Sequence, residues 1–529
     1  MNSMNWLRDI LLILYPEILV FFALIVAIFF STSKLNKYVW IFSSLIMFIG
    51  CVHIIKFQWH LNTPVSILNG MFVADNLSIL FRLLALFTGL LITLGSMKYT
   101  EGFTHKNEFI IILLSSILGV MILSGSNDLI TLFVALETLS LSSILLVGYS
   151  KYDNRSNEAS IKYLLSSASA SSIFLFGLSL IYGLTSATQF DEIKFKLWSL
   201  SSSGDLNYSI ITVILVMVIG GLAFKLASAP LHMWSPDVYE GAPTPTTTFL
   251  AVGSKIAAFA ITLRIIFNLF GNVSNIWQPM IISISILSMI VGNYVALGEV
   301  INKTSIKRFM AYSSIAQVGY ILIGLALAKQ ATISASIFYL VIYSIMNLGA
   351  FLCIIAFGNE ANSDSISSYS GLAKKKPLLA LAFAICLFNL AGLPIPPSGF
   401  IAKFMLLKAS FESGTIGIAL GSIALFTTIL SVYYYSYIAK LMIVDKPSNE
   451  VNNMDSNPES IGKSLELNFA ISLAVIAIFS LTIISNKVLN VSNRTGKYLA
   501  NNQIYLTKNK TSPSLTALLT KRQLSIKHL

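Results

Sequence analysis

The chain has 529 residues, of which 55% are hydrophobic and 11% are charged, and its net charge is +12. Soluble globular domains carry about a quarter charged residues, so this composition excludes a soluble fold and indicates a membrane protein. The basic residues are spread among short loops, which favours a topological role for the positive charge and argues against nucleic acid as a partner.

Long apolar runs recur from end to end, each long enough to cross a hydrocarbon core of about 30 Å as a helix. They are too long and too continuously apolar for barrel strands, so we predict an all-α polytopic membrane protein. The first run lacks a basic start and a cleavage site and is expected to stay as a helix. We expect about fourteen spans, near residues 10–30, 38–55, 74–97, 108–125, 127–149, 160–184, 208–230, 245–270, 276–300, 309–328, 332–358, 377–411, 414–443 and 466–486.

The loops predict the orientation. When Lys and Arg are sorted by alternate loops, about fourteen fall on one side and about six on the other, before the final tail. The richer side should face the cytoplasm or its organellar equivalent, and an even number of spans places both termini on the opposite side. The tail after Lys487 is basic with no acidic residue. For this tail a disordered, solvated segment is the preferred prediction and a docking segment the alternative.

Proline interrupts two spans, at FKLASAPLHMWSPDVYEGAPTP and at LAGLPIPPSGFIAKF. In hydrocarbon such a break is tolerated only where protein or a water-filled cavity satisfies the backbone. The broken spans, the seventh and the twelfth, are five apart, so spans 4–8 and 9–13 form two inverted five-helix repeats, as in transporters. Pro243 and Pro245 are instead expected to begin span eight. The resulting divisions are 1–107 (helices 1–3), 108–271 (first repeat), 272–445 (second repeat) and 446–529 (loop, helix 14 and tail).

Four ionisable residues lie too deep in their spans for easy snorkelling: Glu137, Lys225, Lys255 and Lys403. A charge at such depth costs about 3 kcal/mol or more, so intramembrane charges are usually functional. One buried ion pair could simply fix helix packing. Three lysines and a glutamate distributed over two repeats favour a hydrated path for charge.

Lys162 lies within a turn of the start of span six, where snorkelling to the headgroups is equally open. His232 lies in the first broken segment, where a packing histidine is the more common outcome and a proton relay the alternative. Arg82, Arg264 and Glu299 are expected to be structural.

Burial disfavours the charged form of a lysine, whereas a nearby carboxylate favours it. At 4 Å and an effective dielectric near 20, such a pair is worth about 4 kcal/mol. Making and breaking a Glu137–Lys225 contact is therefore a plausible switch for holding and releasing a proton. The contact itself is a hypothesis, because the sequence gives depth and not neighbours. Lys225, Lys255 and Lys403 would then pass protons laterally.

The sequence gives no sign of a redox or nucleotide site of its own. Cys51, Cys353 and Cys386 have no metal-ligand spacing, the five histidines form no HxxxH cluster, and no Gly-rich phosphate loop is found. We expect no cofactor in this chain.

Five motifs stand out: SNDLITLFVALE, YDNRSNEASIKYLL, LHMWSPDVYEGAPTP, IKRFMAYSSIAQVGY and LAGLPIPPSGF. Together they resemble the antiporter-like membrane subunits of respiratory complex I and its relatives. Within that family they look most like the subunit-2 type of plastid and cyanobacterial NAD(P)H dehydrogenase-like complexes. The resemblance covers roughly residues 10–485. IPPSGF departs from the more usual PLAGF, and the basic tail has no counterpart.

The resemblance implies fourteen helices with inverted repeats and places the family's glutamate and lysines on Glu137, Lys162, Lys225, Lys255 and Lys403. It implies a proton-translocating subunit coupled to quinone reduction in neighbouring subunits. Quinone, iron–sulfur clusters and the electron donor would be held by those partners, which include other antiporter-like membrane-arm subunits. For the plastid and cyanobacterial type the acceptor is plastoquinone, the donor reduced ferredoxin or NAD(P)H, and the membrane the thylakoid; a bacterial plasma membrane or a mitochondrial inner membrane is the alternative.

Two other functions stay open from the sequence. One is a cation/proton antiporter subunit without redox coupling, and the other is a structural membrane scaffold whose ion pairs only hold helices together.

Overall fold

The computed structural model describes residues 3–508, apart from 32–37, 60, 62, 104, 205–206, 455–461 and 463. Within this part, thirteen helices are long and apolar enough to cross a membrane. Two shorter helices, α14 and α15, share one further crossing. The protein is therefore an all-α membrane bundle, as predicted, with one two-stranded antiparallel hairpin that pairs Val65 with Ala74.

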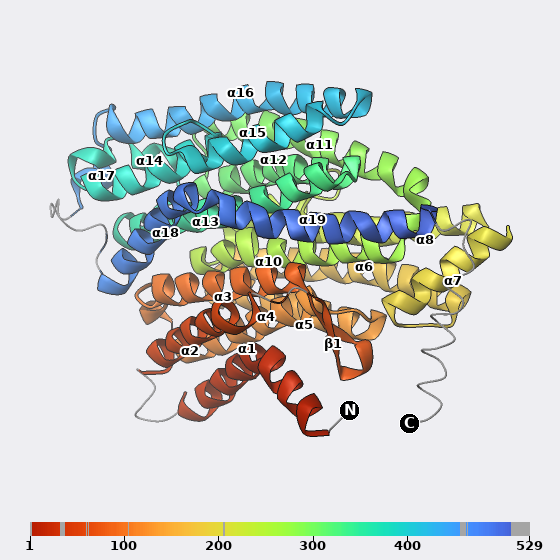
Figure 1. Ribbon diagram of the computed structural model, residues 1–529. Helices are drawn as coiled ribbons and strands as arrows, with labels where there is room; N and C mark the ends of the chain where they lie inside the picture. The colour runs from red at the N-terminus through yellow and green to blue at the C-terminus, as the bar shows by residue number, and fades with distance from the viewer. Residues whose placement is uncertain are drawn as a thin grey trace.

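The N-terminal helices and the first repeat run in chain order across the lower half of Figure 1. The N-terminal elements are α1 (Ser3–Phe30), α2 (Val39–His53), β1 (Val65–Ile67), β2 (Phe72–Ala74) and α3 (Asn76–Ser96). The first repeat contains α4 (Lys106–Gly125), α5 (Leu129–Val147), α6 (Asn154–Thr185), α7 (Phe190–Ser203), α8 (Tyr208–Leu226), α9 (Trp234–Gly241) and α10 (Thr244–Arg264).

The second repeat and the C-terminal elements occupy the upper half and the front of the same view. They are α11 (Ser274–Ile301), α12 (Ile306–Leu327), α13 (Gln330–Ala361), α14 (Pro377–Ala391), α15 (Pro397–Phe411), α16 (Thr415–Ile443), α17 (Asn449–Asn452), α18 (Leu465–Ile483) and α19 (Ser485–Lys508). Single π or 3₁₀ turns occupy Ile54–Gln58, Leu68–Gly70, Tyr99–Gly102, Ile265–Leu269, Gly271–Val273, Ile366–Tyr369 and Leu372–Lys374.

Both predicted breaks are present. The seventh span stops at Leu226 and restarts as the short α9, and the twelfth stops at Ala391 and restarts as α15. The residue after each stop adopts a left-handed conformation that ends the helix, with φ of 53° at Ala227 and 83° at Gly392. Pro243 caps α10 and Pro245 lies in its first turn, so these prolines begin a helix as predicted.

Two helices form the centre of the bundle. The apolar windows of α10 and α13 are completely buried, whereas those of α1, α6, α16 and α18 are 28–39% buried. Apolar composition alone does not explain this burial, because an apolar helix in a bilayer can also face lipid: the span of α1 has a mean hydropathy of 2.7 and is 33% buried, whereas that of α10 has 1.8 and is completely buried. The first repeat thus supplies one central helix and the second repeat the other.

The tail differs from the sequence prediction. Residues 485–508 form α19, which packs along α13, so the preferred prediction of a disordered segment is wrong for this stretch. Val488, Val491 and Leu499 lie on its buried face, and Arg494 and Lys497 lie on the exposed one. This period of three to four residues is the amphipathic pattern of a docked helix. Residues 509–529 lie outside the described part of the chain.

The start of α1 and the end of α19 lie at one end of the bundle, together with α7 and β1 (Figure 1). The prediction that both termini lie on one side of the membrane is not tested by this, because residues 509–529 lie outside the described part of the chain. The helix α7 was not predicted, because its alternation of polar and apolar residues is too short to stand out among the long apolar spans.

Candidate functional site

Lys225 lies in the last turn of α8, directly before the first break. Its Nζ donates to the hydroxyls of Ser140 on α5 (2.7 Å) and Ser167 on α6 (3.0 Å). Both partners are neutral, so hydrogen bonds solvate this ammonium group without a counter-ion in direct contact. A lysine that is solvated in this way can lose its proton without leaving a carboxylate unpaired.

A cavity of about 20 Å³ lies beside Lys225. Ser140, Tyr163 and Ser254 supply its polar lining, with aliphatic side chains around them. This volume is enough for about one water molecule, and the polar groups are of the kind that hold one. Ser254 brings α10 to the wall of this cavity, whereas Lys255 is not among the residues that line it.

Glu137 lies one turn before Ser140 on α5, and its Oε1 is buried without a hydrogen-bond partner in the described part of the chain. No direct ion pair joins Glu137 to Lys225 here; the interaction between them is electrostatic at longer range. The predicted contact is therefore absent in this conformation, since Ser140 and Ser167 occupy the Lys225 ammonium. The two residues nevertheless share one region of the bundle.

Lys255 lies near the middle of α10 and is 1% exposed. Its Nζ donates to Ser314 Oγ on α12 at 2.7 Å, across the boundary between the two repeats. The hydroxyl of Ser314 in turn donates to the Ala311 carbonyl at 2.7 Å. Lys255 therefore connects the first repeat directly to the second.

Lys403 lies on α15, just after the second break, and is buried. Its Nζ donates to the Ala391 carbonyl at 2.9 Å and to Ser431 Oγ at 3.4 Å. The Tyr320 ring lies 5.1 Å from the same nitrogen. The helix break makes this contact possible. Because α14 ends at Ala391, the carbonyl of Ala391 has no intrahelical amide donor and can accept the hydrogen bond from Lys403.

Asn389 holds the second break in shape. Its side-chain carbonyl accepts hydrogen bonds from the Gly399 amide (2.5 Å) and from the Ser398 hydroxyl (3.1 Å), so α14 caps the start of α15. A Cβ added at Gly392 would lie 2.7 Å from Lys403 Cδ. The lysine stem thus passes directly over this glycine.

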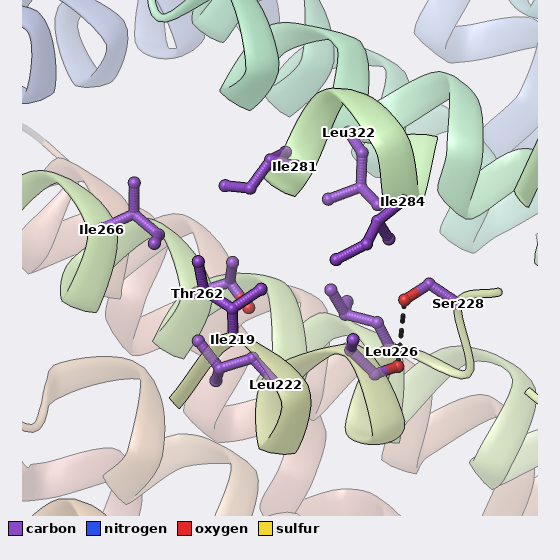
Figure 2. Close-up of a pocket in the computed structure, with 10 residues that line it drawn as sticks. Ile219, Leu222, Leu226, Ser228, Thr262, Ile266, Ile281, Ile284 and Leu322 are labelled. Carbon is purple, nitrogen blue, oxygen red and sulfur yellow. Dashed lines mark hydrogen bonds between the residues drawn. The ribbon is translucent and has the colours of Figure 1, made fainter. Parts of the chain in front are cut away.

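The two repeats meet elsewhere across an apolar seam, which Figure 2 shows. A cavity of about 20 Å³ there is lined mainly by aliphatic side chains of α8, α10, α11 and α12. Its two hydroxyl groups, on Ser228 and Thr262, already donate to the carbonyls of Ala223 and Ala258. Such a cavity stays dry, so this seam offers no polar connection between the repeats, in contrast to the Lys255–Ser314 contact.

Lys162 is placed apart from the other lysines. Its side chain is 47% exposed on the outer face of α6 and pairs with Glu158 (2.8 Å) and Asp237 (3.0 Å). Asp237 also binds Arg308, which pairs further with Glu240 and Glu299. These six residues form one ionic cluster on the wall of the bundle, which the sequence did not reveal.

His232 lies in the first broken segment, as predicted, and is mostly buried. Its Nδ1 has no hydrogen-bond partner in the described structure, and its ring lies edge-on to Tyr312 at 6.4 Å. No contact joins it to Lys225 or Lys255 among the bonds found in the described residues.

Two buried arginines have counter-ions. Arg82 pairs with Glu17 at 3.1 Å, and Arg264 pairs with Asp75 at 2.8 Å. Each pair joins the N-terminal helices or their hairpin to a neighbouring helix, which fits the structural role predicted for the two arginines.

Sequence reasoning missed the buried pair Glu360–Lys376 and the buried tyrosines of the second repeat. Glu360 and Lys376 lie near helix ends, where charged side chains are expected to reach solvent, so their burial could not be predicted. Tyr320, Tyr339 and Tyr343 are nearly inaccessible, although a run of tyrosines within apolar helices was a readable signal. In the described residues no group of three His, Cys, Asp or Glu side chains is arranged to hold a metal ion.

Comparison with known proteins gives a consistent result. Residues 126–431 match the family model described as NADH:quinone oxidoreductase/Mrp antiporter, TM. NAD(P)H-quinone oxidoreductase subunit 2 of Gloeothece citriformis is 43% identical over 84% of this chain and 85% of the relative. The same subunit of Synechococcus elongatus is 42% identical over 84% of each chain.

Solved structures are similar over nearly the whole chain. A chain of respiratory complex I from Thermus thermophilus is 26% identical with a TM-score of 0.72, covering 90% of this chain and 98% of the other. A chain of the Mrp complex from Dietzia sp. DQ12-45-1b has a TM-score of 0.80 at 22% identity, covering 93% and 98%, which shows the shared fold.

Proposed function

Because this chain belongs to the NADH:quinone oxidoreductase/Mrp antiporter membrane-subunit family and is a proton-pumping membrane-arm subunit of an NDH-1-type quinone oxidoreductase, we propose that its protons move along the row Lys225, Lys255 and Lys403. The observation that carries this proposal is the partner chemistry of these lysines. Lys255 and Lys403 are buried and Lys225 is partly buried, and all three ammonium groups are bound by hydroxyls or a backbone carbonyl; no carboxylate of the described residues forms an ion pair with them.

The row has a direction in the fold. Lys225 ends the broken α8, Lys255 stands on the central α10, and Lys403 follows the second break. A water-sized cavity lies between Lys225 and α10, the helix that carries Lys255, and Ser314 carries the contact from Lys255 into the second repeat. When one lysine in its NH₃⁺ form gives its proton to the next lysine in its NH₂ form, one positive charge moves along the row and no other group changes.

Glu137 acts as the charge that biases the first lysine. A carboxylate close to a buried lysine favours the ammonium form, and the effect weakens as the two separate. The unpartnered Oε1 of Glu137 and the hydroxyl partners of Lys225 describe the separated state. Rotation of these side chains into contact would produce the paired state, in which Lys225 holds its proton.

Lys162 and His232 take different roles. Lys162 belongs to the ionic cluster around Asp237 and Arg308, so we assign it to coupling between α6 and the segment after the first break. His232 packs in that segment beside Tyr312, close enough to respond to its movement. Both residues would influence the row from outside it.

The relatives also support a proposal for the type of complex and the membrane. They are NAD(P)H-quinone oxidoreductase subunits of cyanobacteria, so we assign this chain to the translocase part of such a complex in a thylakoid membrane. Partner subunits, including other antiporter-like ones, would hold the iron–sulfur clusters, the quinone and the site for ferredoxin or NAD(P)H. Plastoquinone is the acceptor expected in that membrane.

The test is Lys225→Met in the complete complex reconstituted into vesicles. Methionine keeps the length and the apolar stem and removes the proton carrier, so assembly should be normal and the number of protons pumped per electron should fall. Lys151→Met is the matched control, because Lys151 is exposed in the loop between α5 and α6. Full pumping by the Lys225→Met complex would refute the row.

A further inference from the structure

One face of α12 connects Lys255 to Lys403. Ser314, Gln317 and Tyr320 lie three residues apart, so they follow one side of the helix. Ser314 accepts from Lys255, and the Tyr320 ring lies against Lys403. All three residues are buried. The short motif SSIAQVGY therefore spans the distance between two lysines that make no contact of their own in the described structure.

Gln317 stands in the middle of this face with both ends of its amide engaged. Its Nε2 donates to the Leu390 carbonyl at 3.3 Å, and its Oε1 accepts the hydroxyl of Tyr339 on α13. Leu390 precedes Ala391, whose carbonyl binds Lys403. The amide thus reaches the same stretch of broken backbone that holds the lysine.

Tyr339 and Tyr343 are buried and lie four residues apart, so they share one side of α13. The Tyr343 hydroxyl donates to the carbonyl of Ala251, one turn before Lys255, and the Tyr320 hydroxyl donates to Thr427 at 3.1 Å. One tyrosine therefore lies near Lys255 and another near Lys403, and Tyr339 is joined to the α12 face between them through Gln317.

Resting on the proposed function, we infer that Gln317 and Tyr339 are positioning residues for the proton step from Lys255 to Lys403. A hydroxyl accepts one proton while it releases another, so the Tyr339 hydroxyl is a suitable intermediate position on the way. An amide oxygen accepts a hydrogen bond and does not release a proton. Gln317 therefore orients the Tyr339 hydroxyl and holds it beside the second break.

The step balances without any further reactant. Lys255 NH₃⁺ gives up one proton, the Tyr339 hydroxyl accepts one proton and releases its own once it turns from the Gln317 oxygen, and Lys403 NH₂ becomes NH₃⁺. The apolar seam of Figure 2 offers no parallel route, since its only hydroxyls are bonded to backbone carbonyls.

A purely structural explanation also has to be tested, because buried tyrosines commonly satisfy their hydroxyls and fill a core. The two explanations differ in what they predict. A structural role changes assembly and thermal stability, whereas a positioning role changes the number of protons pumped per electron in a complex that is assembled normally.

The experiment compares Tyr339→Phe and Gln317→Leu with Lys403→Met in the complete reconstituted complex. Tyr369→Phe is the control, because Tyr369 is a tyrosine of equal burial whose hydroxyl has no partner in the described structure. We expect Tyr339→Phe and Gln317→Leu to lower the proton-to-electron ratio to the level of Lys403→Met, with normal melting temperature, and Tyr369→Phe to pump normally.

A further variant, Gln317→Glu, separates the two explanations, because a protonated carboxyl group still accepts the Tyr339 hydrogen bond and also releases protons. We expect Gln317→Glu to pump better than Gln317→Leu and to shift the pH profile of pumping. Wild-type ratios for Tyr339→Phe and Gln317→Leu, with pumping lost in Lys403→Met, would overturn this inference and leave the row intact. Normal pumping by Lys403→Met would instead refute the row.

Discussion

The buried pair Glu360–Lys376 allows a sharp test of the electrostatics of this bundle. Lys376 Nζ lies 3.5 Å from Glu360 Oε1, and both side chains are 2% exposed. Neither carboxylate oxygen has a hydrogen-bond partner in the described structure, so the lysine is the main compensation for this charge. At an effective dielectric near 20, Coulomb's law gives an attraction of about 5 kcal/mol at this distance.

We expect Glu360→Gln and Lys376→Met each to destabilise the protein by about 3–5 kcal/mol, because each removes one partner of a buried ion pair. The exchanged double variant Glu360→Lys with Lys376→Glu restores opposite charges and should recover most of the loss. The assay is the thermal inactivation midpoint of the purified complex, together with the amount of assembled complex in the membrane.

The control is Glu101→Gln, which removes an ion pair that is shorter but exposed. Lys98 and Glu101 lie 2.7 Å apart with side chains 47% and 54% exposed, so solvent screening should leave the midpoint unchanged in this variant. Glu360→Gln with an unchanged midpoint, or an exchanged double variant less stable than both single variants, would refute the reasoning.

Two more predictions concern the second break and a loop. Gly392→Ala should lower pumping in an assembled complex, because its φ of 83° costs alanine about 1–2 kcal/mol and the new Cβ displaces the Lys403 stem; Gly414→Ala, with φ of 95° and nothing near its Cβ, is the control that should pump normally. At the loop after α5, burial raises the pKa of Tyr149 to about 12, with the Glu108 carboxylate adding to the shift. The native state therefore keeps this proton where the unfolded chain loses it, and the resulting stabilisation is present below about pH 10 and lost between about pH 10 and 12. Melting curves against pH should show a smaller loss over that interval in Tyr149→Phe, and equal slopes would contradict the shift.

The sequence carried most of the fold because the bilayer restricts the choices. Apolar length predicted the spans, and proline inside an apolar run predicted the breaks at Leu226 and Ala391. The helix α19 could not be found in this way, since its mean polarity resembles that of a solvated tail. Its docking depends on Val488, Val491 and Leu499 meeting α13, which is a tertiary contact.

The sequence predicted how deep the candidate residues lie in their helices, but not which side chains they contact. Depth along a helix predicted Lys225, Lys255 and Lys403 to lie inside the bundle; Lys255 and Lys403 are buried and Lys225 is partly buried. Lys162 was added through the family resemblance, and it faces outward in an ionic cluster. The Glu137–Lys225 contact could not be predicted from depth, because rotamers and neighbouring serines decide which atoms meet.

The partners of the buried cations separate two kinds of residue that the sequence alone did not distinguish. Arg82 and Arg264 each meet a carboxylate within about 3 Å, and moving the charge would leave that carboxylate unpaired. Lys225, Lys255 and Lys403 meet serine hydroxyls and a carbonyl, which accept a hydrogen bond from the ammonium form and stay neutral when the proton leaves. Losing the charge therefore costs the first group an ion pair and relieves the second of a desolvated cation. For this reason the lysines suit proton transfer and the arginines suit fixed helix packing, and in this chain the hydroxyl partners are a better indicator of the proposed row than depth in the membrane.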